Sequence, residues 1–182
     1  MACDLTQGRK EPCKDVVGGI KKVYFTDFGD FGTVDFTDEQ ITDMSGTFEA
    51  FEYDLKGNSS FEQTVNSSRE NGTTFFEQTL NLTLKKLSKE DNKELKLLAY
   101  GRPHVAVEDY NGNVMVMGLD NGADVSGGTI VTGAAMGDLS GYTLTFTAQE
   151  TSPAKFLASP TAADPYAGMS SATVTVTEGT NS

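Results

Sequence analysis

The sequence predicts a mainly β fold, in which two antiparallel sheets pack as a sandwich or barrel and one α-helix lies on the flank. Apolar and polar residues alternate along Thr73–Leu84 and again along Gly141–Thr147, which is the period of a half-buried strand. Asn-Gly pairs beginning at Asn71 and Asn111 separate such runs and favour tight turns. Only 37% of the residues are hydrophobic, whereas glycine occurs 19 times, so turns and strands are favoured over helices.

The first predicted strand is Gly19–Phe25, and it leads into a loop rich in glycine and aspartate. Aromatic side chains are unusual in a loop that contacts only solvent, so those found here either fill the core of their own domain or bind a neighbouring copy. They are Phe25, Phe28, Phe31 and Phe36. Residues Asp38–Met44 are then expected to form a short helical turn or loop.

A hairpin is predicted next, from Phe48–Leu55 through a turn at Lys56, Gly57 and Asn58 to Ser59–Val65. The run Thr73–Leu84 is the clearest strand of the chain, because its apolar residues share one parity and its threonines the other. The apolar side is made by Phe76, Leu80, Leu82 and Leu84.

One helix is predicted over residues 88–100. Ser88 is a typical N-cap residue, with Asp91 three positions later in a weakened capping box, and Gly101 and Pro103 follow the end of the helix. Its apolar residues form a stripe that suits packing on a sheet. They are Leu95, Leu97, Leu98 and Tyr100.

Short strands at regular spacing are predicted beyond the helix, at His104–Val107, Val114–Leu119, Thr129–Thr132 and Gly141–Thr147. A further strand is predicted at Ala172–Thr177, either at the far edge of its own sheet or added to the sheet of another copy. The chain thus divides into an N-terminal arm (1–17), a β-sandwich core (18–147) with a contact loop at 26–47, and a C-terminal extension rich in alanine, threonine and proline (148–182).

Acidic residues dominate the chain, with 26 against 14 basic residues, a formal charge of -12 and a pI near 4.4. Such a surface repels phosphate, so we do not expect the protein to grip nucleic acid. No apolar run is long enough to cross a membrane, and Met1–Leu5 does not begin a signal peptide, so synthesis in a cytosol is expected. Basic residues gather near the N-terminus, where they either meet an acidic surface of a neighbouring copy or are simply solvated. They are Arg9, Lys10, Lys14, Lys21 and Lys22.

We do not expect an enzyme, a metal site or a bound cofactor. His104 is the only imidazole, and no serine or cysteine nucleophile has a convincing base beside it. Glu49 and Glu52 are close enough in sequence to suggest a carboxylate pair, but the chain has no tryptophan to line a sugar-binding cleft. The segment Asp120–Asp124 resembles half of a calcium loop, yet it lacks the downstream glutamate and is more simply a turn.

The two cysteines, Cys3 and Cys13, are ten positions apart. With a single histidine they cannot complete a four-ligand zinc site of sulfur and imidazole. Because the protein is expected to be made in a cytosol, both are predicted to be free thiols, with a bridge only after release from the cell.

The segment from Thr73 to Leu157 resembles the tail tube proteins of bacteriophages in the order of its elements. It contains a strand that reads FEQTL from Phe76, a helix rich in lysine and leucine that ends in AYG, an Asn-Gly hairpin and a turn that reads GLDNG. The most distinctive part is Gly137–Phe146, which reads GDLSGYTLTF, and Glu150 and Pro153 follow it. The resemblance covers a little under half of the chain.

Members of that family fold as two packed antiparallel sheets with a flanking helix, form six-membered rings and stack the rings into a channel for DNA. The resemblance implies a virion structural protein of the phage tail, made in the host bacterial cytoplasm, whose partners are its own copies and other tail proteins such as sheath, baseplate and terminator proteins. Double-stranded DNA would pass without specific binding. The resemblance also implies that the arm 1–17 and the loop 26–47 bridge one ring to the next, and the candidate contacts between subunits are Lys10, Lys14, Phe25, Phe28, Phe31 and Phe36.

Three other classes of function are compatible with the sequence. The chain could be another structural protein of the virion, such as a neck, baseplate-ring or capsid decoration protein. It could be a carbohydrate-binding β-sandwich that uses exposed aromatic residues such as Tyr110 and Tyr142. An enzyme that depends on Glu49 or Glu52 is the third alternative.

Overall fold

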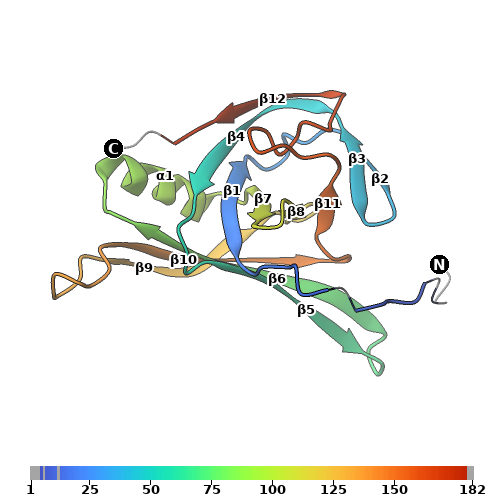
Figure 1. Ribbon diagram of the computed structural model, residues 1–182, viewed down its shortest axis with the longest axis horizontal. Helices are drawn as coiled ribbons and strands as arrows, with labels where there is room; N and C mark the ends of the chain where they lie inside the picture. Colours follow the sequence, from blue (N-terminus) through green and yellow to red (C-terminus); the bar gives the residue numbers. More distant parts are fainter. Residues whose placement is uncertain (1–4, 6, 12, 180–182) are drawn as a thin grey trace.

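The computed structural model describes residues 5, 7–11 and 13–179, which form two β-sheets and one α-helix (Figure 1). The larger sheet has eight strands in the order β12-β4-β1-β7-β8-β11-β3-β2, and the smaller has four in the order β5-β6-β10-β9. The larger sheet consists of β1 (Ile20–Thr26), β2 (Val34–Thr37), β3 (Gln40–Met44), β4 (Gly46–Asp54), β7 (His104–Asp109), β8 (Val114–Met117), β11 (Lys155–Leu157) and β12 (Ala172–Thr177). The smaller sheet consists of β5 (Ser60–Ser68), β6 (Thr73–Lys85), β9 (Asp124–Val131) and β10 (Gly141–Glu150). The predicted mainly β fold is confirmed, as an open sandwich and not a closed barrel.

One hydrophobic core lies between the two sheets. Val23 and Phe25 of β1 point into it from the larger sheet, and Leu80 of β6 and Phe146 of β10 point into it from the smaller sheet. Successive residues of a strand face opposite sides of its sheet, so the alternation read in β6 and β10 places their apolar residues on this one face. The rings of Phe25 and Phe146 have centroids 5.2 Å apart, which joins the two layers directly.

The opposite face of the larger sheet buries a second core. Tyr24 of β1 and Ile41 of β3 point into it, and the sheet curls so that β4 and β12 arch over it (Figure 1). Tyr166 and Met169, from the segment between β11 and β12, are buried in the same cluster. Strand β1 is therefore buried on both faces, which explains why its apolar residues alternate imperfectly.

Two of the elements predicted before the helix are wrong. Strands β4 and β5 do not form a hairpin, because β4 pairs with β1 and β12 whereas β5 pairs with β6 in the other sheet. Gly57 and Asn58 do turn the chain, both with positive φ, but they carry it from one sheet to the other. The segment Asp38–Met44, predicted as a helical turn or loop, contains strand β3, which is stabilised by its hairpin with β2.

The C-terminal segment predicted as an extension is part of the sandwich where the structure describes it. Strand β10 continues to Glu150, β11 pairs with β8 and β3, and β12 pairs with β4. A boundary at 147 therefore does not separate the core from an appendage. The predicted last strand is confirmed, and its partner is the sheet of its own chain. The pairs β11 with β3 and β12 with β4 are parallel, so the larger sheet is mixed and not antiparallel throughout.

The helix α1 (Lys89–Tyr100) lies where the sequence predicts it. The Ser88 side chain caps it by accepting a hydrogen bond from a backbone N–H of the first turn at 3.0 Å. The Tyr142 hydroxyl of β10 accepts a hydrogen bond from the Ser88 N–H at 3.2 Å, which ties the helix to the smaller sheet. The predicted apolar stripe is only partly buried, because Leu97 and Tyr100 face solvent.

The predicted turns at Asn71 and Asn111 are confirmed as the β5–β6 and β7–β8 hairpins. Gly72 and Gly112 have φ values of 62° and 83°, where a side chain would be strained and glycine is not. The strands predicted after the helix also form, and β9 and β10 are longer than the patterns that predicted them.

Candidate assembly surfaces

The smaller sheet exposes a broad polar face on the side away from the core, at the bottom of the view in Figure 1. We call this the outer face, and define it by the residues that the strand registers place opposite to the core residues. They are Ser60, Glu62, Thr64, Asn66 and Ser68 of β5, Thr73, Phe75, Glu77, Thr79, Asn81, Thr83 and Lys85 of β6, Gly141, Thr143, Thr145, Thr147 and Gln149 of β10, and Asp124, Gly127, Thr129 and Val131 of β9.

Hydroxyl and amide groups dominate the outer face and bond to one another across the strands. Thr145 Oγ1 donates to Asn81 Oδ1 at 2.9 Å, and the hydroxyl oxygens of Thr129 and Thr143 are 2.6 Å apart. Three carboxylates and one lysine give this face a net charge of -2 (-3 + 1). The face is thus polar and weakly acidic, a surface that does not attract phosphate groups.

Both edges of the smaller sheet are open in the part of the chain that the structure describes. Strand β5 pairs only with β6, and β9 pairs only with β10. The sheet is also slanted, because β5 lies along the Thr73 half of β6, whereas β9 follows the half of β10 that pairs with the Lys85 end of β6. Each edge presents unpaired N–H and C=O groups over eight or nine residues, and neither strand contains a proline.

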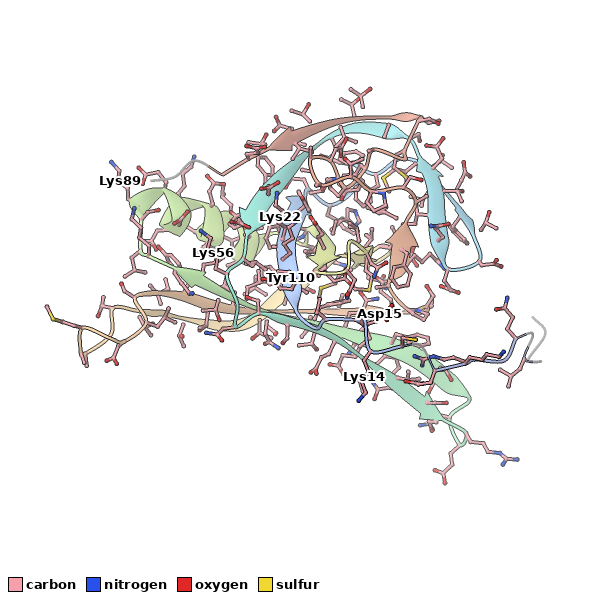
Figure 2. The ribbon with its side chains drawn as sticks, in the orientation of Figure 1. Lys14, Asp15, Lys22, Lys56, Lys89 and Tyr110 are labelled. Carbon is pink, nitrogen blue, oxygen red and sulfur yellow. The ribbon has the colours of Figure 1, made fainter. Side chains whose placement is uncertain are left out.

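The N-terminal arm is exposed and has no regular secondary structure where the structure describes it, at residues 5, 7–11 and 13–17, and it bends at Lys14. Its predicted contact residues Lys10 and Lys14 are both exposed, and Figure 2 shows Lys14 and Asp15 on this segment, outside both cores. Cys13 is a free, exposed thiol, and Cys3 lies outside the described residues. The arm is an exposed, irregular segment with three basic side chains, Arg9, Lys10 and Lys14, on its described part.

The arm is fastened to the body at its base. The carboxamide of Asn111, in the β7–β8 turn, accepts a hydrogen bond from the Val17 N–H at 3.1 Å and donates one to the Val17 carbonyl at 2.8 Å. Asp109 in turn accepts from the Asn111 N–H at 2.8 Å, which holds the turn in place. The two bonds between Asn111 and Val17 resemble the paired bonds of a β-ladder. They fix the direction in which the arm leaves β1.

The four predicted phenylalanine contacts separate into different environments. Phe25 is 3% exposed and packs in the core between the sheets, which is the core alternative of the prediction and leaves it unavailable as a contact between subunits. Phe31 is half-buried against the second core. Phe28 and Phe36 are 48% and 55% exposed, and they keep surface that a neighbour could cover.

His104 organises the loop that carries Phe28 and Phe31. Its ring is stacked between theirs, with centroid distances of 5.0 and 4.3 Å. Its Nδ1 lies 2.7 Å from the Gly118 carbonyl, and its Nε2 accepts a hydrogen bond from the Gly29 N–H at 3.3 Å. Because Nε2 accepts a bond, Nδ1 carries the proton of a neutral imidazole. Burial lowers the pKa of His104, and its role is structural.

Strands β2 and β3 form an acidic hairpin at one end of the larger sheet. Glu39, between the two strands, forms an ion pair with Lys155 of β11 at 3.0 Å, and the Lys155 amine lies 4.6 Å from the centre of the Phe36 ring. Asp43 accepts bonds from the N–H and hydroxyl of Ser171, which lower its pKa to about 2. The hairpin is therefore fixed to both β11 and the start of β12.

Buried polar groups near β1 were not predicted from the sequence. Glu108 is 5% exposed and accepts bonds from the Lys21 amine at 2.8 Å and the Tyr24 hydroxyl at 3.1 Å. Burial raises the pKa of Tyr24, so the phenol stays protonated and donates. Each acidic group here has a partner, which makes the cluster a structural element of the larger sheet. No local sequence signal reveals it, because Lys21, Tyr24 and Glu108 meet only through the pairing of β1 with β7.

The residues on which the alternative functions depend do not form sites. Glu49 and Glu52 lie on opposite faces of β4, and Glu52 forms an ion pair with Lys22 at 2.9 Å. Tyr142 is fully buried and cannot stack on a sugar. Tyr110 remains 49% exposed on the β7–β8 turn, where Figure 2 labels it.

The segment Asp120–Asp124 forms a turn whose groups point the wrong way for a cation. The backbone N–H groups of Asp120 and Asn121 donate to one oxygen of Glu150, at 3.2 and 2.9 Å, so this turn binds a carboxylate of its own chain. Burial raises the pKa of Glu150. Across the described residues, no group of three His, Cys, Asp or Glu side chains is placed to hold a metal ion.

Comparisons with known proteins add no relative: no family model, no curated protein and no solved structure matches the chain. In the described part of the chain, α1 is the single helix, and it is too short and too polar to cross a membrane.

Proposed function

We propose that this protein is a structural component of a phage virion whose copies join into rings, and that stacked rings form the tube of the tail. The observation that carries the proposal is the smaller sheet, which is slanted and which, among the residues that the structure describes, is open at both edges and uncovered on its outer face. Strand β5 of one copy pairs with β9 of the next, and this head-to-tail contact closes when the rotation between copies completes a circle. The smaller sheets then form one continuous wall.

The outer face lines the channel of this ring. Its hydroxyl and amide groups and its net charge of -2 per copy give a wall that is wetted but repels phosphate, so DNA slides past without binding. In a ring of six, the whole protein carries -72 (6 × -12), which keeps free copies apart and makes assembly dependent on salt.

Electron microscopy of the purified protein at high concentration tests this proposal. The expected result is rings or tubes with a central hole. The edge variant Val65→Lys places a charge on β5, at a residue that is 61% exposed in the single chain, and abolishes the rings while the monomer stays folded. The matched control Leu97→Lys changes a helix residue of similar exposure, 56%, and leaves the rings intact.

Two results contradict the proposal. If the wild-type protein stays monomeric at every concentration, its open edges do not form contacts between copies, and the ring proposal is contradicted. Equal loss of rings in Val65→Lys and Leu97→Lys would mean that the copies do not join through β5. Rings that never stack would instead favour a neck or baseplate ring built from the same contact.

A further inference from the structure

Three asparagine-glycine pairs occur in the chain, and each lies in a turn. Asn71 begins the pair in the β5–β6 turn, Asn111 the pair in the β7–β8 turn, and Asn121 the pair between β8 and β9. Such a pair is chemically labile, because no side chain on the glycine shields its backbone nitrogen from the asparagine carboxamide. The three pairs are alike in sequence, and the structure distinguishes them.

The pair at Asn111 is held by hydrogen bonds on both of its reactive groups. The Asn111 carboxamide donates to the Val17 carbonyl at 2.8 Å and to Asp109 at 3.2 Å, and it accepts from the Val17 N–H at 3.1 Å. The Gly112 N–H donates to the Asp109 carbonyl at 3.3 Å. The carboxamide must leave these partners before it can meet the glycine nitrogen.

The pair at Asn121 is held in a similar way. The Asn121 carboxamide donates to the Gln149 carbonyl at 2.8 Å, and the Gly122 N–H donates to the Gly118 carbonyl at 3.1 Å. Gly122 is also buried, so close to the Phe28 ring that a Cβ on it would lie 2.9 Å away. This pair therefore has neither a free carboxamide nor space around the glycine.

The pair at Asn71 lacks these restraints. Asn71 and Gly72 are exposed at the tip of the β5–β6 hairpin, which lies at one end of the molecule in Figure 1. The Asn71 carboxamide makes no hydrogen bond with any described residue, and only its backbone N–H is engaged, by the Ser68 hydroxyl at 3.3 Å. The Gly72 N–H has no acceptor among the described residues either, and a Cβ at Gly72 would have no atom within 4 Å.

We propose that Asn71 is a site of spontaneous deamidation in the folded protein, and that Asn111 and Asn121 are protected from the same reaction. The Gly72 nitrogen loses its proton and bonds to Cγ of Asn71, while the bond from Cγ to Nδ2 breaks and ammonia leaves. Water then opens the cyclic imide. Cleavage between Cγ and the nitrogen gives aspartate, and cleavage between the backbone carbonyl and the nitrogen gives isoaspartate. Each conversion consumes one water, releases one ammonia and transfers no electrons.

The modification changes both charge and backbone at this turn. A carboxylate replaces a neutral amide beside Glu70, so the formal charge of the chain changes from -12 to -13 (-12 - 1). Isoaspartate also adds one carbon atom to the main chain, within the turn that sets the register of β5 on β6. The change lies next to the edge of β5 that stays open in the described part of the chain. The inference concerns a single chain and does not depend on the proposed function.

Mass spectrometry of aged protein tests the inference. The purified, folded protein is kept near neutral pH, sampled over time and digested, and fragmentation of the peptides locates each change. The peptide with Asn71 should gain the mass difference between an acid and an amide, and it should separate into two chromatographic peaks of equal mass, for aspartate and isoaspartate. Asn111 and Asn121 should react roughly tenfold or more slowly, because each must first break its hydrogen bonds.

Two controls accompany this measurement. Asn71→Gln keeps a carboxamide but would have to close a larger ring, so the peptide with this residue should stay unchanged. In concentrated urea the bonds that hold Asn111 and Asn121 are lost, so all three pairs should react at similar rates.

Three results overturn the inference. Equal rates at the three pairs in the folded protein would mean that the bonds at Asn111 and Asn121 give no protection. Reaction of Asn71 in urea but not in the folded protein would mean that the hairpin turn prevents the attack. Formation of aspartate without isoaspartate would contradict the cyclic imide as the intermediate.

Discussion

Acidification should destabilise the protein through His104, the only histidine of the chain. The imidazole is 3% exposed, lies between two phenylalanine rings, and is bonded as a neutral group through both nitrogens. A second proton would sit on Nε2, facing the Gly29 N–H, so it would turn a hydrogen bond into a repulsion between two donors. The loop that carries Phe28 and Phe31 would lose its anchor.

The sign and ceiling of the effect follow from linkage. Burial lowers the pKa of His104 in the folded state from its ordinary value of 6.5, so the unfolded chain binds the proton more readily. The stabilisation is complete above pH 6.5 and is lost as the pH falls below that value. At 1.36 kcal/mol per pH unit, the loss between pH 6.5 and pH 5 is at most about 2 kcal/mol.

Chemical denaturation of the monomer at pH 7.5 and pH 5 measures this loss, with His104→Gln as the reference. Glutamine retains a donor and an acceptor but does not titrate, so subtracting its pH dependence removes the contribution of the carboxylates, including Glu150. We expect the wild type to lose more stability than the variant, by at most about 2 kcal/mol. Equal pH dependence of the two proteins would show that His104 is not held neutral by its surroundings, and the reasoning would be refuted.

Three further changes have distinct expected outcomes. Asn111→Ala should leave the free energy of unfolding within about 1 kcal/mol of wild type but speed proteolysis of the arm, whereas Asn113→Ala should not, because Asn111 and not Asn113 bonds to the described part of the arm. Leu80→Ala should lower the free energy of unfolding by about 2 to 5 kcal/mol, against less than about 0.5 kcal/mol for the exposed Leu97→Ala, and similar losses would contradict the assigned core. Asp43→Ala should raise hydrogen exchange in β12, because it frees the segment before that strand. In the wild type the same loosening should develop as the pH falls from 3.8 toward about 2, where Asp43 gains its proton. Unchanged exchange would contradict the role of Asp43.

Much of the fold could be predicted because local chemistry decides it. Ser88 caps the helix through a bond within its first turn, and Gly72 and Gly112 close hairpins whose strands are neighbours in the sequence. The site was less predictable. Phe25 and Phe28 are three positions apart and equally aromatic, yet Phe25 is buried in the core and Phe28 is half exposed. The difference arises because the smaller sheet packs on Phe25.

The sequence by itself determined most of the strands, though not β2, β3 or β11, together with the start of the helix and the presence of a basic arm on an acidic body. Each of these depends on residues that are close together along the chain. Only the tertiary structure decided that β4 pairs with β1 and β12 and not with β5, and that β12 pairs within its own chain. The same holds for the two edges of the smaller sheet that stay open in the described part of the chain. The reason is that strand pairing joins residues far apart in sequence, and the partner that buries the most apolar surface prevails over the nearest one.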